Sequence, residues 1–205
     1  GKITVTKGIG ISVKGDGKAE VAAGEIEVES DTSNIGININ GTADTSNTTI
    51  TDGTITVAGT RTGINIEGTG NVTLKNTTIT LSGAGTGIKY DGKTTKATAE
   101  ISTGDMEVAQ SGATGIDATM SKVAESTLNI KTGIISTENA GATGIKITGG
   151  TGTDSGTSIA TVTTTLGATA GTGVEVAGAK NNTINVTLQD SLTKESSNTV
   201  VSGTG

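Results

Sequence analysis

The sequence lacks cysteine, proline, histidine, tryptophan and phenylalanine, and Tyr90 is its single aromatic residue. Without cysteine the chain can form neither disulfides nor thiolate metal sites. Without histidine and cysteine it cannot build the Ser-His or Cys-His pairs of nucleophilic catalysis. Because proline removes a donor from the strand ladder, its absence suits a chain that is mostly strand.

Charge and hydropathy argue against a nucleic-acid-binding protein and against a membrane-spanning segment. The 14 basic and 20 acidic residues give a net charge of −6 with scattered signs, so there is no basic track for nucleic acid. No apolar run approaches membrane-spanning length, and no signal peptide is visible. We therefore expect no nucleic-acid partner, no direct membrane insertion by this segment and no cofactor. Because the chain begins at Gly1 without a Met and opens in mid-pattern, we expect it to be an excerpt of a longer polypeptide.

Large aliphatic residues are few. Isoleucine, valine and leucine make 42 of the 205 residues, which lies near the border below which a chain fails to bury enough surface to fold. Their placement argues against disorder, because they fall at matching positions of a repeated phrase. The clearest copy of this phrase is Thr62-Gly63-Ile64-Asn65-Ile66-Glu67-Gly68.

The phrase returns along the whole chain, and its leading glycines are 26, 27, 24, 28, 29 and 29 residues apart. A loose period of this size is typical of a solenoid, in which each repeat buries its apolar face against its neighbours. After each glycine, apolar and polar residues alternate, which predicts a short strand. Each glycine is expected at a corner that needs unusual backbone angles or close packing. These corner glycines are Gly10, Gly36, Gly63, Gly87, Gly115, Gly144 and Gly173.

Between the Gly-Ile phrases lies a second apolar pattern around an inner glycine, as in Ile50-Thr51-Asp52-Gly53-Thr54-Ile55. It predicts one strand before that glycine and one after it. Three strands per repeat of roughly 27 residues describe an all-β fold, a right-handed parallel β-helix with a triangular cross-section. About seven coils, stacked ~4.8 Å apart, would form a rod roughly 35 Å long. Residues 1–205 would be a single segment of this rod.

Stacking the Gly-Ile strands in register predicts two interior rows. The first row is Ile11, Ile37, Ile64, Ile88, Ile116, Ile145 and Val174. The second row is Val13, Ile39, Ile66, Tyr90, Ala118, Ile147 and Val176. Tyr90 beside Ala118 indicates a volume compensation, and the Tyr90 hydroxyl needs a partner or an exit to solvent. The outward row between them is Ser12, Asn38, Asn65, Lys89, Asp117, Lys146 and Glu175, whose last four members alternate in sign.

Candidate chemistry is sparse, and we predict neither a catalytic residue nor a metal site. Glu25, Glu27 and Glu29 share one face, but an exposed acidic face explains them better than a carboxylate pair in a cleft. The segment Gly149-Gly150-Thr151-Gly152-Thr153-Asp154 matches the start of a calcium-binding nonapeptide. Because Gly156 stands where a large apolar residue belongs and no second copy follows, it is interpreted as a loop insertion. Arg61, the single arginine, is interpreted as a surface residue at a corner.

Threonine is abundant, with more than forty residues. Thr-x-Thr pairs at Thr4/Thr6, Thr54/Thr56, Thr78/Thr80 and Thr161/Thr163 raise the possibility of an ice-binding array. The equivalent positions in other repeats hold acidic residues such as Glu25 and Glu107, which break such a lattice. Threonine on strand exteriors is otherwise ordinary β propensity.

The Thr-Gly-Ile-x-Ile and Asn-Thr-Thr-Ile-Thr phrases, with the Lys, Glu, Thr and Gly bias, resemble the passenger domains of large autotransporter adhesins, most closely the fusobacterial outer-membrane adhesins. The resemblance covers the whole chain. It implies a bacterial cell-surface β-helix, anchored at the outer membrane through a C-terminal β-barrel outside this segment. The expected function is a non-enzymatic stalk that mediates attachment to host cells or other bacteria. Its expected partners are the neighbouring coils of the same polypeptide and a surface receptor or glycan, and its ligand-binding residues are unknown.

Two other functions stay open at this stage. A β-helix polysaccharide-processing enzyme or a phage tailspike or fibre segment would share the repeat. An enzyme of this kind requires a long loop and clustered carboxylates, whereas the loops here are short. An ice-binding β-helix is the second alternative.

Overall fold

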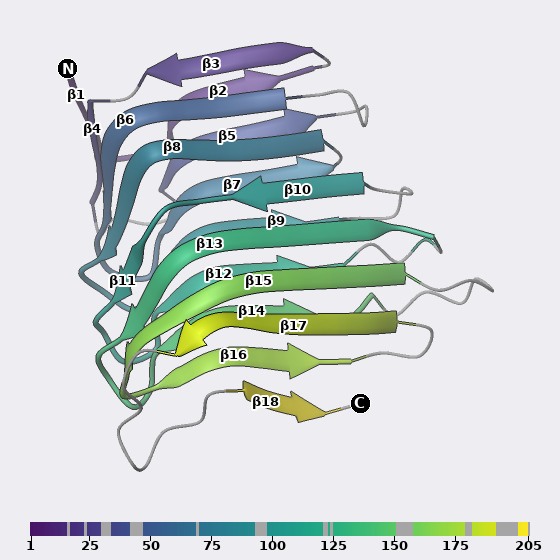
Figure 1. The fold of residues 1–205 in the computed structure, drawn as a ribbon. Helices are drawn as coiled ribbons and strands as arrows, with labels where there is room; N and C mark the ends of the chain where they lie inside the picture. The colour runs from purple at the N-terminus through teal and green to yellow at the C-terminus, as the bar shows by residue number, and fades with distance from the viewer. Residues whose placement is uncertain are drawn as a thin grey trace.

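The computed structural model describes residues 1–15, 17–22, 24–29, 34–41, 47–68, 70–92, 98–120, 123, 125–150, 158–178, 182–191 and 201–204. Within these ranges the chain is all-β, and no helix that could cross a membrane is found there. Parallel strands stack on one another as a β-solenoid (Figure 1). The expected all-β class and the stacking of parallel strands are therefore confirmed.

The described residues form two sheets. One of them, here called the Gly-Ile sheet, contains the Gly-Ile phrases and has eight described strands. Each strand pairs in parallel with the next strand of the same sheet, one repeat further along the chain. From one edge to the other its strands are β2 (Ile9–Lys14), β5 (Ile35–Gly41), β7 (Thr62–Gly68), β9 (Thr86–Asp91), β12 (Thr114–Thr119), β14 (Thr143–Thr148), β16 (Thr172–Ala177) and β18 (Val201–Thr204).

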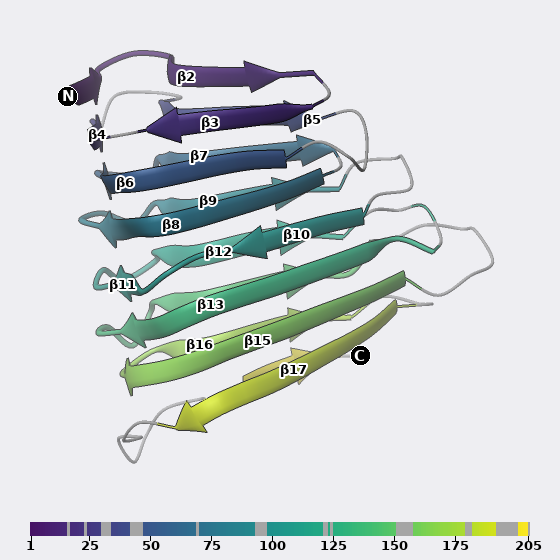
Figure 2. The same ribbon diagram turned by 45° about the horizontal axis from the view of Figure 1, so that its top comes forward.

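The second sheet, here called the bent sheet, has ten strands in the part of the chain that the structure describes. Its longest strands are β6 (Asn47–Val57), β8 (Gly70–Leu81), β13 (Thr127–Thr137) and β15 (Ser158–Thr169), and they turn through a corner without interruption (Figures 1 and 2). The strands are β1 (Lys2–Val5), β3 (Lys18–Ala22), β4 (Glu25–Val28), β6 (Asn47–Val57), β8 (Gly70–Leu81), β10 (Thr98–Ser102), β11 (Met106–Val108), β13 (Thr127–Thr137), β15 (Ser158–Thr169) and β17 (Asn182–Ser191).

The bent sheet corrects one expectation. The two inner strands predicted for each repeat are separate in β3/β4 and in β10/β11, but they form one continuous strand in β6, β8, β13 and β15. In β6 and β8 the turn occurs at Asp52 and Asn76, whose φ values are 52° and 50°. Asp and Asn tolerate this left-handed conformation better than other non-glycine residues. A single such residue turns the strand while the residues on both sides stay in the ladder.

The space between the two sheets holds the aliphatic core. Residues from the bent sheet, such as Ile26, Ile55 and Ile79, are fully buried, and so are Ile37 and Ile64 from the Gly-Ile sheet. Short β-branched side chains fill this space because each coil packs against the coil before it and the coil after it. The solenoid therefore needs no large aromatic core.

Candidate functional site

The predicted interior rows are brought together in the Gly-Ile sheet. Ladder pairs join Ile11 to Ile37 and continue through each member of the first row to Val174. The second row pairs in the same way from Val13 to Val176. The members between the ends are buried, whereas Ile11, Val13 and Val176 are only half-buried. The rows form a continuous packed seam whose exposure rises at the ends.

The corner glycines occupy positions where a side chain has no room. A Cβ built on Gly36, Gly63, Gly87, Gly115 or Gly144 would lie 2.5–2.7 Å from the carbonyl oxygen of the equivalent glycine one coil further on. At Gly10 the same distance is 2.8 Å, to the Gly36 oxygen. None of these six glycines has a positive φ. Close packing between coils, rather than unusual backbone angles, therefore explains this row.

Tyr90 is enclosed in the seam. Its side chain is 2% exposed and lies directly opposite Ala118, which is 0% exposed. The Tyr90 hydroxyl donates to the Gly68 carbonyl oxygen at 3.4 Å, so the phenol oxygen has a polar neighbour although the ring is buried. The pairing places the largest member of the row against the smallest.

The outward row of the Gly-Ile sheet is also in register. Asn65 Nδ2 donates to Asn38 Oδ1 at 2.8 Å, one coil apart. Further along, Lys89 lies opposite Asp117 in the strand ladder, and Asp117 lies opposite Lys146. Lys146 Nζ lies 3.6 Å from Glu175 Oε1, and both side chains are substantially exposed. The Asn65–Asn38 and Lys146–Glu175 contacts link neighbouring coils. Asn65 is 8% exposed, and the exposed Lys146–Glu175 ion pair contributes little to stability.

Asn34 has a buried structural role that the sequence alone does not reveal. The side chain is 2% exposed, and its Nδ2 lies 3.0–3.2 Å from the carbonyl oxygens of Val5, Thr6 and Glu29. Its Oδ1 accepts a hydrogen bond from the Gly8 amide at 2.9 Å. One amide side chain therefore satisfies backbone groups of two successive coils at a corner. The signal in the sequence was only a polar residue directly before Ile35-Gly36.

A run of buried threonines inside the bent sheet was also missed. Val21, Ile50 and Leu74 begin an interior row. In later coils Thr103, Thr132 and Thr164 continue it, and they are 8%, 6% and 0% exposed. Thr132 Oγ1 donates to Thr164 Oγ1 at 2.6 Å, whereas the buried Thr103 Oγ1 has no hydrogen-bond partner in the described structure. The interior is therefore not uniformly apolar.

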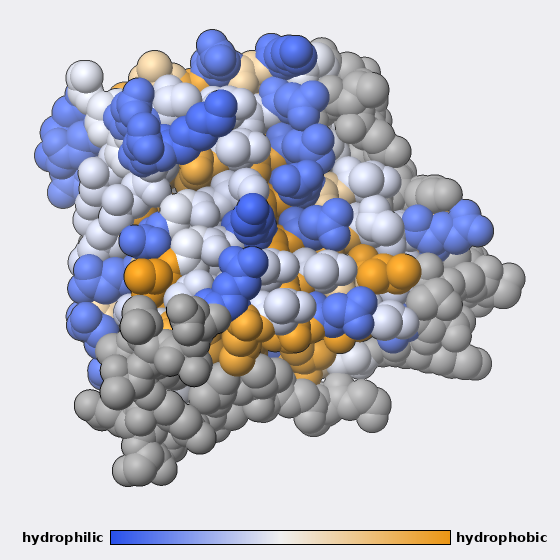
Figure 3. All heavy atoms as spheres, in the orientation of Figure 1, coloured by the Kyte–Doolittle hydropathy of each residue, from blue (hydrophilic) through white to orange (hydrophobic). Residues whose placement is uncertain are grey.

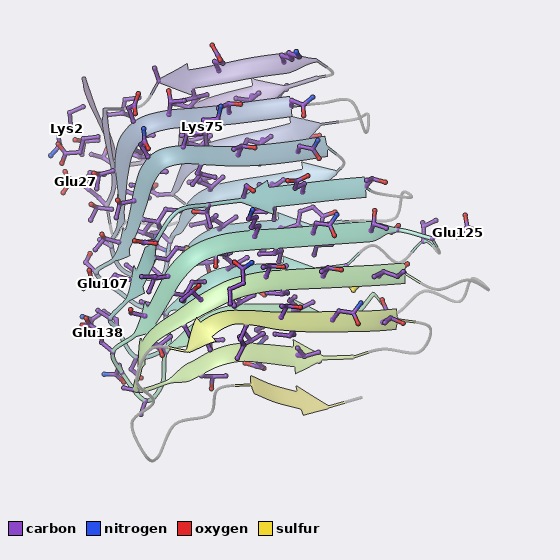
Figure 4. The ribbon with its side chains drawn as sticks, in the orientation of Figure 1. Lys2, Glu27, Lys75, Glu107, Glu125 and Glu138 are labelled. Carbon is purple, nitrogen blue, oxygen red and sulfur yellow. The ribbon has the colours of Figure 1, made fainter. Side chains whose placement is uncertain are left out.

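The candidate carboxylates form no cleft. Lys2 Nζ lies 3.0 Å from both Glu25 Oε1 and Glu27 Oε2. Figure 4 shows Lys2 and Glu27 along the same outer edge of the molecule as Glu107 and Glu138. Hydrogen bonds to the Glu27 and Glu25 carboxylates raise the pKa of the Lys2 ammonium group. Glu29 is exposed and follows the end of β4. The arrangement is an exposed ion-pair cluster on strand exteriors.

The threonine pairs do not merge into one array. Thr54 and Thr56 lie in register with Thr78 and Thr80, which makes a patch of four threonines. Glu25 and Glu27 border this patch in the preceding coil, and Glu107 lies opposite Thr80 in the following coil. The Thr161/Thr163 pair lies elsewhere in the bent sheet, beside Asn129 and Lys131. The lattice is therefore interrupted by acidic side chains after two strands.

The other motifs give no assembled site. Arg61 is partly buried, and its Nη1 donates to Thr60 Oγ1 at 3.0 Å. In the nonapeptide match, Gly149 and Gly150 are buried, while 151–154 and Gly156 lie outside the described residues. Within the described ranges no group of three or more Asp, Glu, His or Cys residues could hold a metal ion.

One small cavity lies near the N-terminal end, between the sheets. Its volume is about 60 Å³, and Val13, Ile39, Ile66, Thr48 and Val72 are among the residues that line it. Sites for small organic ligands usually measure about 300–1,000 Å³. This cavity has room for water-sized molecules and is too small for a sugar or a cofactor.

The outer face of the bent sheet is the most extended candidate binding surface. Figure 3 shows this side covered mainly by hydrophilic and intermediate side chains, with hydrophobic ones between them. Ladder pairs align a row of amides and other polar groups, in the order Lys18, Asn47, Asn71, Glu100, Asn129, Thr161 and Asn185. Asn71 Nδ2 donates to Asn47 Oδ1 at 3.0 Å, which ties two of these coils together.

Such a row offers one polar group per coil at the spacing of neighbouring strands, about 4.8 Å. It could form many weak hydrogen bonds to an extended ligand that lies along the solenoid. At its N-terminal end, an open depression of about 680 Å³ is lined by Lys18, Ala19, Glu20, Asn47 and Thr49. Comparisons of the chain with protein-family models, with curated proteins and with solved structures gave no match.

Proposed function

We propose that the chain is a non-enzymatic segment of a cell-surface rod: a right-handed parallel β-helix of about seven coils that forms the stalk of a bacterial adhesin. The observation that carries the proposal is the unbroken register of the two interior rows, from Ile11 to Val174 and from Val13 to Val176. Each coil repeats the packing of the previous one, so adding repeats adds length to the rod. Length is what a stalk supplies.

The surface supports a spacer with weak adhesive capacity. The outer faces carry hydroxyl, amide and mixed-charge side chains, and the small interior cavity cannot accept a substrate. The Thr-Gly-Ile-x-Ile phrases that resemble autotransporter passenger domains lead us to place the rod outside the cell, anchored at the outer membrane through a region beyond this chain. The proposed partners are neighbouring coils of the same polypeptide and a receptor or glycan on another cell.

Surface exposure is the first test. Antibodies raised against the purified 205-residue chain should label intact cells that produce the protein, and external protease should remove the label. Labelling that requires permeabilised cells would refute the proposal.

Adhesion is a separate measurement, made with cells from which the segment has been deleted in frame. A stalk predicts reduced attachment to host cells or other bacteria, because the binding region is displayed closer to the membrane. Unchanged attachment would argue against the adhesive role.

A further inference from the structure

The corner of the bent sheet changes its length between β8 and the coil that follows it. Ser102 lies opposite Thr73, and Met106 lies opposite Ile79, so β10 and β11 cross the corner in two residues fewer than β8 does. In the described ladder, residues 74–78 of β8 therefore have no partner in β10 or β11. Figures 1 and 2 show the interruption between these two strands. On its other side, β8 stays in register with β6 both before and after the corner.

The contact between residues 62–81 and residues 86–108, here called the β8/β10 junction, is also loosely packed at this corner. A Cβ built on Gly104 would meet one described atom within 4 Å, the Thr77 carbonyl oxygen of the preceding coil, at 3.4 Å. A Cβ built on Gly133, the equivalent residue of the following coil, would lie 3.1 Å from the Gly104 carbonyl carbon. The corner therefore packs more closely against the coil after it than against the coil before it.

Side-chain amides link the two coils before the junction, and these links do not continue across it. They are Asn65 Nδ2 to Asn38 Oδ1 at 2.8 Å, Asn71 Nδ2 to Asn47 Oδ1 at 3.0 Å and Asn76 Nδ2 to Asp52 Oδ1 at 3.0 Å. Across the junction the first two rows continue with Lys89 and Glu100. The third row ends at the corner, where the described ladder has no partner for Asn76.

The interior row changes character at the same level. Leu74, which is 5% exposed, is followed across the junction by Thr103, which is 8% exposed. The Thr103 hydroxyl has no hydrogen-bond partner among the described residues. A buried hydroxyl without a partner lowers stability, so the junction loses an aliphatic contact and gains a polar cost.

We infer that the solenoid has a built-in hinge at the β8/β10 junction, where it divides into two cooperative units. In a stacked repeat protein, stability is the sum of the stabilities of the repeats and of the interfaces between neighbours. A weak interface inside the stack uncouples the coils on its two sides, so each side opens as a unit of its own. The inference depends on strands inside the rod, and it is independent of the adhesive role.

Hydrogen exchange of the purified 205-residue chain at increasing urea concentration, read by mass spectrometry of its peptides, tests the hinge. Peptides from β5 to β8 should share one urea midpoint, and peptides from β12 to β15 should share another. The step between the two midpoints should fall at the β8/β10 junction. A single midpoint for all these peptides would overturn the inference, and so would a gradual change without a step or a step at another level.

Strengthening the junction should bring the two midpoints together. Thr103→Val restores an aliphatic side chain to the interior row, and Glu100→Asn continues the outer amide row across the junction, so the double variant should show a smaller step. Thr161→Asn is the matched control, because it adds an amide to the same outer row between Asn129 and Asn185, away from the junction. The control should leave the step unchanged. A step of wild-type size in the double variant, or an equal reduction in the control, would contradict the hinge.

A disulfide across the junction provides a second test if the double variant does not fold. Thr73 and Ser102 are direct ladder partners, and neighbouring strands about 4.8 Å apart lie within the Cα separation of disulfides. In Thr73→Cys/Ser102→Cys the step should disappear in oxidising buffer and return on reduction. Lys131→Cys/Thr163→Cys joins the same row at another level and should keep the step in both buffers. A step that survives the oxidised junction disulfide would refute the assignment.

Discussion

The pairing of Tyr90 with Ala118 predicts a strong energetic coupling between two neighbouring strands. In the wild-type seam the phenol ring lies between Ile66 of the preceding coil and Ala118 of the following coil, and both Tyr90 and Ala118 are buried. Ala118→Ile adds three carbon atoms opposite the ring, so overpacking should reduce the free energy of unfolding by about 1–3 kcal/mol. Tyr90→Ile removes part of the ring volume and the hydroxyl contact to Gly68, and should also reduce it by about 1–3 kcal/mol.

The double variant Tyr90→Ile/Ala118→Ile should be far more stable than the sum of these losses predicts. It would restore an isoleucine pair like those elsewhere in the row, so we expect a coupling energy of about 1–3 kcal/mol in favour of the double variant. Urea unfolding followed by circular dichroism measures the four chains. Because repeat arrays can lose two-state cooperativity, amide hydrogen exchange in β9 and β12 should be measured alongside.

The control pair is Ala118→Ile with Ile37→Val. Ile37 lies in β5, three strands from β12 in the order of the Gly-Ile sheet, so the two changes should add. Additive losses for Tyr90 and Ala118 as well would refute the volume argument. An Ala118→Ile chain that keeps Tyr90 and is as stable as the wild type would refute it equally.

Four further outcomes are expected. Thr103→Val removes a buried hydroxyl without a partner and should raise the free energy of unfolding by about 1 kcal/mol. Thr132→Val breaks a buried hydroxyl pair and should lower the free energy of unfolding by about 1 kcal/mol. Urea unfolding of both variants measures whether the two effects have opposite signs. Gly115→Ala should lower the free energy of unfolding by about 1–3 kcal/mol and shift the thermal midpoint down. Gly104→Ala is the control: its new Cβ would meet its nearest neighbour at 3.4 Å, so the thermal midpoint should change little. Because the Lys2 pKa is raised, the ion pairs of Lys2 with Glu25 and Glu27 stabilise the folded state below the ordinary lysine pKa of 10.5, and this stabilisation is lost as the pH rises through the raised pKa. The free energy of unfolding measured against pH should show this loss in the wild type and not in Lys2→Met. The interrupted threonine patch predicts no thermal hysteresis, and a measurable hysteresis gap would contradict that interpretation.

Several elements were predictable because they depend on local spacing. Alternation of two residues determines which side chains of a strand share a face, and a repeat near 27 residues brings equivalent strands onto one another. These two regularities were enough to assign Ile64 and Ile66 to neighbouring interior rows and Asn65 to the opposite face of the strand, where contacts with Asn38 and Glu67 leave it only 8% exposed. The placement of Tyr90 opposite Ala118 followed from the same alignment.

Other features depended on contacts that no local pattern records. The bend at Asp52 and Asn76 keeps β6 and β8 continuous, because each takes a left-handed conformation and Asn76 donates a hydrogen bond to Asp52 in the preceding coil. The sequence had pointed to the inner glycine as a break between two strands. The sequence analysis made no prediction for Asn34, because its role appears only when backbone groups of two coils converge on it.

The sequence by itself determined the all-β class, the stacking of parallel strands and the alignment of the Gly-Ile rows, because these follow from the period of the apolar residues. Only the tertiary structure decided why the corner residues must be glycine, where hydroxyl groups such as that of Thr103 enter the interior, and which row members lose their cover at the ends. Those properties depend on the distance from one coil to the next. That distance is set by packing between residues far apart in the chain, so it is not contained in any one repeat.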